Sequence, residues 1–81
     1  MKLRYSKHFL EQYAAAPTAV RKAFDKQGAL LVENFRHPSL RAKKYDDARR
    51  LWQGPVNRSW RFYFAVEGDE YILHEIRPHP K

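Results

Sequence analysis

The sequence RSWRFYFAVE, residues 58–67, carries the clearest strand pattern in the chain. Along an extended backbone, successive side chains point to opposite sides. One side of this stretch then carries Trp60, Phe62, Phe64 and Val66, and the other carries Ser59, Arg61, Tyr63 and Ala65. The pattern predicts a strand whose aromatic face is covered by the rest of the protein, which leaves Arg61 and Tyr63 on an open face.

The segments around this strand predict a mainly antiparallel sheet. Glu67–Asp69 is expected to turn the chain back, and Glu70–Arg77 to form the last strand of a hairpin. Before it, Leu40–Tyr45 and Arg49–Gln53 read as two short, charged strands, followed by a turn at Gly54–Asn57.

The first part of the chain predicts one strand and two helices. Lys2–Tyr5 alternates polar and apolar residues, and Ser6 and Thr18 are natural N-caps for the helices that follow. The apolar stripe of the second helix consists of Val20, Phe24, Leu31 and Phe35, and Gly28 on the same stripe is expected to let the helices approach closely. The predicted fold is α+β, in the order β-α-α-β-β-β-β, with a helical hairpin on one face of a twisted sheet of four to five strands.

Length and composition indicate a single domain, residues 1–81, in a reducing compartment. The 81 residues have no cysteine, so disulfides, a thiol nucleophile and a zinc ribbon are excluded. The N-terminus lacks an apolar run of signal length, and no stretch approaches the ~18 apolar residues of a membrane span. We therefore expect a soluble cytoplasmic protein without a membrane partner.

Positive charge is concentrated in one part of the chain. The formal net charge is +7, and residues 36–61 contain eight basic and two acidic side chains, which leaves only +1 for all other residues. A localised excess of this kind suits phosphate binding, because each neutralised phosphate releases counterions. The alternative is a solvated basic surface that binds nothing specific.

Three stretches resemble the RelE branch of the RelE/ParE superfamily of toxins from type II toxin-antitoxin systems. They are HPSLRAKKY at 37–45, LWQGPVNRSWRFYF at 51–64 and the C-terminal IRPH at 76–79. The resemblance implies a ribosome-dependent endoribonuclease that cleaves mRNA in the ribosomal A site, by attack of the 2′-OH on the scissile phosphate. Such chemistry needs no metal or other cofactor.

The resemblance also implies roles for individual residues, at the positions where this sequence matches the family. Arg61 resembles the arginine that contacts the scissile phosphate, and His79 resembles a histidine that serves as general acid; Lys43 is expected to assist catalysis. The RNA-binding residues are expected to be Arg41, Lys44, Arg49, Arg50, Trp52, Arg58, Tyr63 and Arg77. The main alternative for Arg61 is an ion pair with a surface carboxylate such as Glu75.

The general base stays open at this point, with Asp46, Asp47, Glu75 and His74 as candidates beside the lysines. By parity, His74 is expected on the core face. No cysteine or carboxylate lies near His74 and His79 at the spacing that metal ligands have, so no metal site is expected.

The resemblance also implies a partner, a cognate antitoxin whose segment folds on binding beside the helical hairpin and forms a hetero-oligomer with the toxin. Two other functions share the fold. One is the poisoning of DNA gyrase, as in the ParE branch, and the other is a non-catalytic member that binds RNA or antitoxin only.

Overall fold

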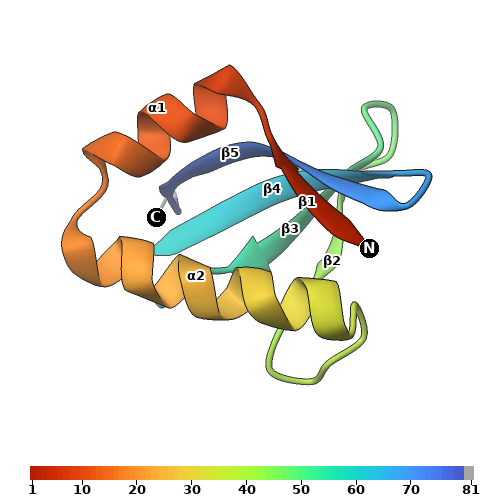
Figure 1. Cartoon of the computed structure of the whole chain (residues 1–81), viewed down its shortest axis with the longest axis horizontal. Coiled ribbons are helices and arrows are strands. Elements are labelled where there is room, and N and C mark those ends of the chain that lie inside the picture. The colour runs from red at the N-terminus through yellow and green to blue at the C-terminus, as the bar shows by residue number, and fades with distance from the viewer. Residues whose placement is uncertain (80–81) are drawn as a thin grey trace.

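The computed structural model describes residues 1–79, so the last two residues of the expected domain lie outside it. Its elements are β1 (Lys2–Tyr5), α1 (Lys7–Ala15), α2 (Thr18–Glu33), β2 (Lys43–Asp46), β3 (Leu51–Pro55), β4 (Trp60–Glu67) and β5 (Glu70–Pro78). The five strands form one sheet in the order β1-β5-β4-β3-β2, and α2 lies across one of its faces (Figure 1). The predicted fold class and element order are confirmed.

Strand β1 and helix α1 anchor the chain along strand β5. β1 pairs with β5 in parallel, and every other strand pair is antiparallel. Ser6 caps α1 as predicted, because its side chain accepts a hydrogen bond from the Phe9 N–H at 3.0 Å. One turn further, the Gln12 Oε1 accepts the Ile76 N–H at 2.9 Å, so α1 covers β5 where β1 no longer pairs with it.

Helix α2 differs from the prediction at both ends. The N-cap is Pro17, and the Thr18 hydroxyl accepts a hydrogen bond from Arg21 Nη2 at 3.0 Å instead of capping the helix. The helix ends at Glu33, before Phe35. Gly28 faces strand β1, where an added Cβ would lie 3.4 Å from Leu3 Cδ1, so its small size serves helix–strand packing and not the helix–helix approach that we expected.

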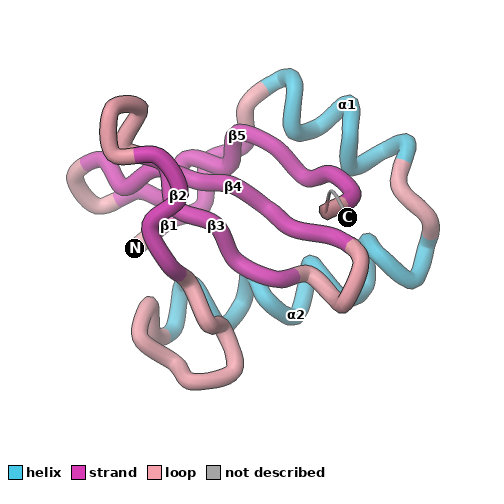
Figure 2. The backbone as a smooth tube through the Cα atoms, turned by 180° about the vertical axis from the view of Figure 1, so that it is seen from behind, coloured by secondary structure: helices cyan, strands magenta, loops and turns pink. Residues whose placement is uncertain are grey.

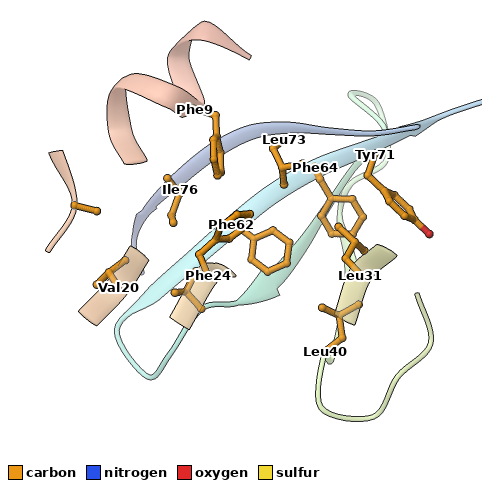
Figure 3. Close-up of a cluster of buried hydrophobic side chains, with 12 residues drawn as sticks. Phe9, Val20, Phe24, Leu31, Leu40, Phe62, Phe64, Tyr71, Leu73 and Ile76 are labelled. Carbon is orange, nitrogen blue, oxygen red and sulfur yellow. The ribbon is translucent and has the colours of Figure 1, made fainter. Parts of the chain in front are cut away.

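Aromatic rings fill the space between the helices and the sheet (Figure 3). Phe24 of α2 packs against Phe9 of α1 at 5.1 Å and against Phe62 of β4 at 5.3 Å between ring centroids. Phe62 and Phe64 are fully buried, which confirms the aromatic face of β4. Val66 is an exception, being 44% exposed near the end of that strand. Among residues 1–79, no helix has the length and apolar character that crossing a membrane requires.

The boundaries of the middle strands lie later in the chain than predicted. β2 and β3 begin at Lys43 and Leu51, and β3 continues through Gly54–Pro55. The turn before β4 therefore comprises residues 56–59. It is closed by Asn57, whose Oδ1 accepts the N–H groups of Ser59 and Trp60 at 2.8 and 2.9 Å. This asparagine turn replaces the predicted Gly-Pro turn.

A bulge at His74 changes which face the side chains of β5 occupy. Tyr63 pairs with Glu75, whereas Phe64 pairs with Leu73, so His74 is the extra residue. Leu73 and Ile76 are therefore both in the core, and Ile72 stands opposite Ala65 on the other face. His74 itself is only half-buried, so its expected place in the core was wrong.

Candidate functional site

Helix α2 leaves one face of the sheet open, and Figure 2 views the strands from that side, with α2 behind them. Two arginines stand opposite each other on β4 and β5. Arg61 of β4 pairs directly with Arg77 of β5, and Pro55 of β3 pairs with Arg61 on its other side. Directly paired residues share one face, and like charges in that position repel each other. A sheet that places two guanidinium groups together is therefore suited to an anion that bridges them.

Arg61 is held by the turn before β4 and keeps free donors. Its Nη1 donates to the carbonyl of Asn57 at 2.7 Å and to that of Trp60 at 3.0 Å. Its Nε and Nη2 form no hydrogen bond with residues 1–79, and no ion pair joins Arg61 to Glu75. Among residues 1–79, no carboxylate forms an ion pair with Arg61.

Arg77 is fixed by three side chains. Its guanidinium lies over the Tyr63 ring at 4.5 Å, and its Nη2 donates to the Tyr45 hydroxyl at 3.4 Å. Its Nε is 3.1 Å from Glu75 Oε2, an ion pair whose geometry is not that of a hydrogen bond, so this buried nitrogen lacks a hydrogen-bond partner among residues 1–79. The Glu75 carboxylate also lies 3.6 Å from His8 Nε2.

These contacts set the charge state of the cluster. Burial alone would lower the pKa of Arg77, but the Tyr45 hydroxyl and the neighbouring Tyr63 and Glu75 raise it above its ordinary value. Burial raises the pKa of Tyr63, an effect that the positive charge of Arg77 partly offsets. Arg77 is thus a permanent cation, and the Tyr63 hydroxyl stays protonated at neutral pH.

The structure brings His79 to the same end of the open face. Its backbone N–H donates to the Ser59 carbonyl at 2.6 Å, which continues the pairing of β5 beyond Pro78. Extended residues two apart share a face, so His79 follows Arg77, and its side chain is exposed. Arg61, Arg77 and His79 are therefore neighbours, as predicted from the sequence.

A second row of paired residues crosses the open face beside the arginines. It runs from Lys43 on β2 through Gln53 and Tyr63 to Glu75 on β5. Lys43 thus lies two strands away from Tyr63 on the same face. Of the carboxylates considered as a base, Glu75 lies in this row, and Asp46 pairs with Leu51 nearer the other end of β3.

The two aspartates near the end of β2 have other partners. The Asp46 carboxylate accepts the Arg49 N–H at 3.2 Å, and that of Asp47 is 3.8 Å from Lys44 Nζ. Both contacts belong to the turn between β2 and β3, so neither carboxylate is directed toward the arginine pair.

Lys44 and Trp52 lie on the opposite face from the one where we expected them. They pair with each other, and Trp52 also pairs with the core residue Phe64. The Trp52 ring packs edge-on against Phe35 at 5.0 Å, and Lys44 Nζ lies 5.1 Å from the Trp52 ring. The open face therefore lacks both side chains.

The remaining predicted cations are spread around the open face. Arg49 and Arg50 are exposed in the turn after β2, where Arg50 has a positive φ of 55°. Arg41 is exposed just before β2 with a φ of 51°, and Arg58 is exposed in the turn before β4. Arg41 and Arg58 line the same cleft as Arg61, whereas Arg49 and Arg50 precede Leu51, at the end of β3 away from Arg61.

Tyr45 is the site residue that the sequence did not reveal. The register between β2 and β3 shifts at this position, and its ring packs against Tyr63 at 4.8 Å between centroids. Alternation along the sequence cannot predict which face an irregular residue in a short strand occupies. The aromatic side chain was therefore the only feature of Tyr45 that indicated a contact with other residues of the site. Among the described residues 1–79, no group of three or more His, Cys, Asp or Glu side chains is placed to hold a metal ion.

Solved structures of toxins have the same fold. The YoeB/ParE toxin from Agrobacterium tumefaciens superposes with a TM-score of 0.81 at 14% identity, over 99% of this chain and 100% of that chain. The YoeB dimer from Staphylococcus aureus gives 0.82 at 12% identity, over 99% and 98%. The RelB–RelE antitoxin–toxin complex from Methanococcus jannaschii gives 0.76 at 17% identity, over 93% and 88%.

Sequence comparisons add no relative to this set. No protein-family model matches the chain, and no curated protein is significantly similar to it. At identities of 11–17%, the structural likeness concerns the fold, and on that level it confirms the resemblance noted in the sequence. The chain has the fold of the RelE/ParE toxins.

Proposed function

We propose that this protein is the toxin of a type II toxin-antitoxin system and acts as a ribosome-dependent endoribonuclease on mRNA. The observation that carries the proposal is the pairing of Arg61 with Arg77 on the open face. Both guanidinium groups retain N–H donors for phosphate oxygens, and a planar guanidinium binds such oxygens through two parallel hydrogen bonds.

The proposed reaction needs only the RNA and the protein. The ribose 2′ oxygen attacks the adjacent phosphorus, the bond from phosphorus to the 5′ oxygen breaks, and a 2′,3′-cyclic phosphate forms. Arg61 and Arg77 stabilise the charge that develops on the non-bridging oxygens. His79 donates a proton to the leaving 5′ oxygen, because a protonated imidazole is an N–H donor that can act as a general acid.

The 2′-OH proton passes to the Glu75 carboxylate, which lies in the same row of paired residues as Lys43. Tyr63 of the same row is not an acceptor, because its raised pKa keeps the hydroxyl protonated. Its ring instead supports the Arg77 guanidinium at 4.5 Å. The role of Tyr63 is therefore to position an arginine.

The proposal includes an antitoxin and a cytoplasmic site of action, where ribosomes and mRNA are found. Several structures with this fold are toxin-antitoxin complexes, among them DinJ–YafQ from Escherichia coli and YoeB–YefM from Staphylococcus aureus. On this chain, a hollow of about 200 Å³ between the two helices is lined by Tyr5, Phe9, Leu10, Tyr13, Phe24 and Asp25. We assign this hollow to an apolar segment of the antitoxin.

Expression of the chain beside its Arg61→Ala variant tests the proposal. Wild type is expected to stop growth and to create new mRNA 5′ ends within translated codons, and Arg61→Ala is expected to do neither. Arg36→Ala is the matched control, because Arg36 is exposed outside the site and its loss should leave both effects intact.

Two results contradict the proposal. New 5′ ends that persist in a folded Arg61→Ala variant would exclude the phosphate-binding role. Intact mRNA together with failing gyrase supercoiling would identify a gyrase poison of the ParE kind.

A further inference from the structure

Beside the arginine pair, an open cleft of about 780 Å³ lies between helix α2 and the sheet. Its walls come from α2, from the segment before β2, from the second half of β3 and from the turn before β4. It is lined by Ala23, Lys26, Gln27, Ser39, Arg41, Lys43, Gln53, Gly54, Pro55, Val56, Asn57, Arg58 and Arg61. The volume falls within the roughly 300–1,000 Å³ that is typical of ligand sites.

The charge of this cleft is entirely positive. Five of its lining side chains are cationic, Lys26, Arg41, Lys43, Arg58 and Arg61, and none is acidic. The four ion pairs among residues 1–79 involve none of these five cations. Unpaired cations that converge on one cleft repel each other, so the complementary ligand is an anion.

Hydrogen bonds within the protein hold the walls of the cleft together without a ligand. Gln27, which is 8% exposed, donates from Nε2 to the Pro55 carbonyl at 2.8 Å and to the Ser39 carbonyl at 3.4 Å. This single buried amide joins α2 to the segment before β2 and to the end of β3. Arg41, at the cleft wall, has a φ of 51°, a conformation that non-glycine residues adopt at a cost and that is common at ligand sites.

Arg61 belongs both to the cleft and to the arginine pair. A polyanion bound between Arg61 and Arg77 can therefore extend into the cleft, where Lys26 of α2 is a further cation. We propose that the cleft binds a second phosphodiester of the same single-stranded RNA, with Lys26 as its ligand on the helix. This inference rests on the proposed function for the identity of the anion.

A binding titration tests the assignment. The probe is a fluorescent single-stranded RNA of about eight nucleotides, within the usual site sizes, with 2′-O-methyl groups that prevent cleavage. Lys26→Gln is expected to weaken binding about fivefold and to reduce the slope of log K against log salt by about 0.7, the value for one lost phosphate contact on a single strand. Lys22→Gln, one helical turn away and outside the cleft, should change neither quantity appreciably.

Both lysines are exposed, so both variants should keep the fold, which circular dichroism will check. Equal losses for Lys22→Gln and Lys26→Gln would overturn the inference, because they would indicate a diffuse basic surface. Binding of poly-glutamate that depends on Lys26, without such dependence for RNA, would also overturn it and would identify a docking site for an acidic protein segment.

The failure of this inference and that of the proposed function are distinguishable. If ribosome-dependent cleavage occurs but Lys26→Gln binds the RNA as tightly as wild type, the assignment of the cleft is refuted and the ribonuclease proposal stands. If Lys26→Gln weakens RNA binding as described but the wild-type protein does not cleave mRNA, the cleft assignment stands and the ribonuclease proposal falls.

Discussion

Three neighbouring side chains hold the Arg77 guanidinium in one orientation. The Tyr63 ring lies beneath it, the Tyr45 hydroxyl accepts from Nη2, and Glu75 lies beside Nε. A lysine at this position would keep the charge but would lose the planar fork and most of the stacking. The geometry of the group therefore matters in addition to its charge.

We predict that Arg77→Lys lowers the rate of mRNA cleavage about tenfold, which corresponds to about 1.4 kcal/mol of transition-state stabilisation. The thermal midpoint should change little, because Arg77 is only partly buried. Cleavage by purified protein on ribosomes, with Arg36→Lys as the control, measures the effect. An Arg77→Lys variant with the wild-type rate would show that charge alone is sufficient.

The strands that surround these residues were predictable to different degrees. In β4 the sequence placed Phe62 and Phe64 in the core and Arg61 on the open face correctly. Tyr63, which was also expected on the open face, is only 2% exposed, because Tyr45 and Arg77 pack against its ring. β5 contains a bulge at His74, which reverses the parity of the residues before it. The sequence of β5 alone does not predict this bulge, because the position of an extra residue depends on how the strand pairs with its neighbour.

Short strands and caps were harder to predict for a related reason. Trp52 lies in a strand of five residues, too short for its alternation to fix a face, and packing against Phe35 decides its side. At helix α2 the N-cap is Pro17, which makes no side-chain cap hydrogen bond, and the Thr18 hydroxyl accepts from Arg21 instead. Tertiary contacts therefore settled what local propensity left undetermined.

Two glycines in different elements should respond oppositely to the same substitution. A Cβ at Gly54 of β3 would lie 2.7 Å from Cζ of the fully buried Phe62 ring. We predict that Gly54→Ala destabilises the protein by about 1–3 kcal/mol through overpacking. Gly28→Ala in helix α2 meets Leu3 only at 3.4 Å, and it should be neutral or stabilise by up to about 1 kcal/mol through helix propensity.

Urea unfolding of both variants measures these differences in free energy. If Gly54→Ala were as stable as wild type, Phe62 would have room to move, and the tight packing of β3 against β4 would be refuted. A strongly destabilised Gly28→Ala would place Leu3 closer to α2 than the structure has it.

The molecule as a whole should lose stability at alkaline pH. Burial raises the pKa of Tyr63, Tyr71 and Tyr5 above the ordinary value of 10.0, and a hydrogen bond to Asp25 raises that of Tyr13. A raised pKa means that the folded state binds more protons than the unfolded state at high pH. The stabilisation is therefore complete below about pH 10 and is lost as pH rises through the folded-state values.

Urea midpoints measured from pH 8 to pH 11 check this expectation. We predict a decline that begins near pH 10 and that becomes smaller in Tyr63→Phe, which removes one of the titrating groups but keeps the ring under Arg77. An identical decline in Tyr63→Phe would show that Tyr63 does not contribute to it.

The whole molecule presents one continuous basic surface, from the arginine pair on the open face to the cleft beside α2. The helices cover the opposite side of the sheet and offer an apolar hollow between them. The cations of the arginine pair and of the cleft are thus separate from the residues that line the hollow assigned to an antitoxin. This separation is compatible with one chain that binds both an RNA and a protein segment.

The 2′-OH mechanism at the arginine pair is tested most directly with a programmed ribosome and two matched mRNAs. One is all-ribo, and the other carries a single 2′-deoxy nucleotide immediately 5′ of the scissile phosphate. We predict that the wild-type protein cuts the first and not the second, and that Arg61→Ala cuts neither. Equal cleavage of both mRNAs, or of neither, by the wild-type protein would contradict this mechanism.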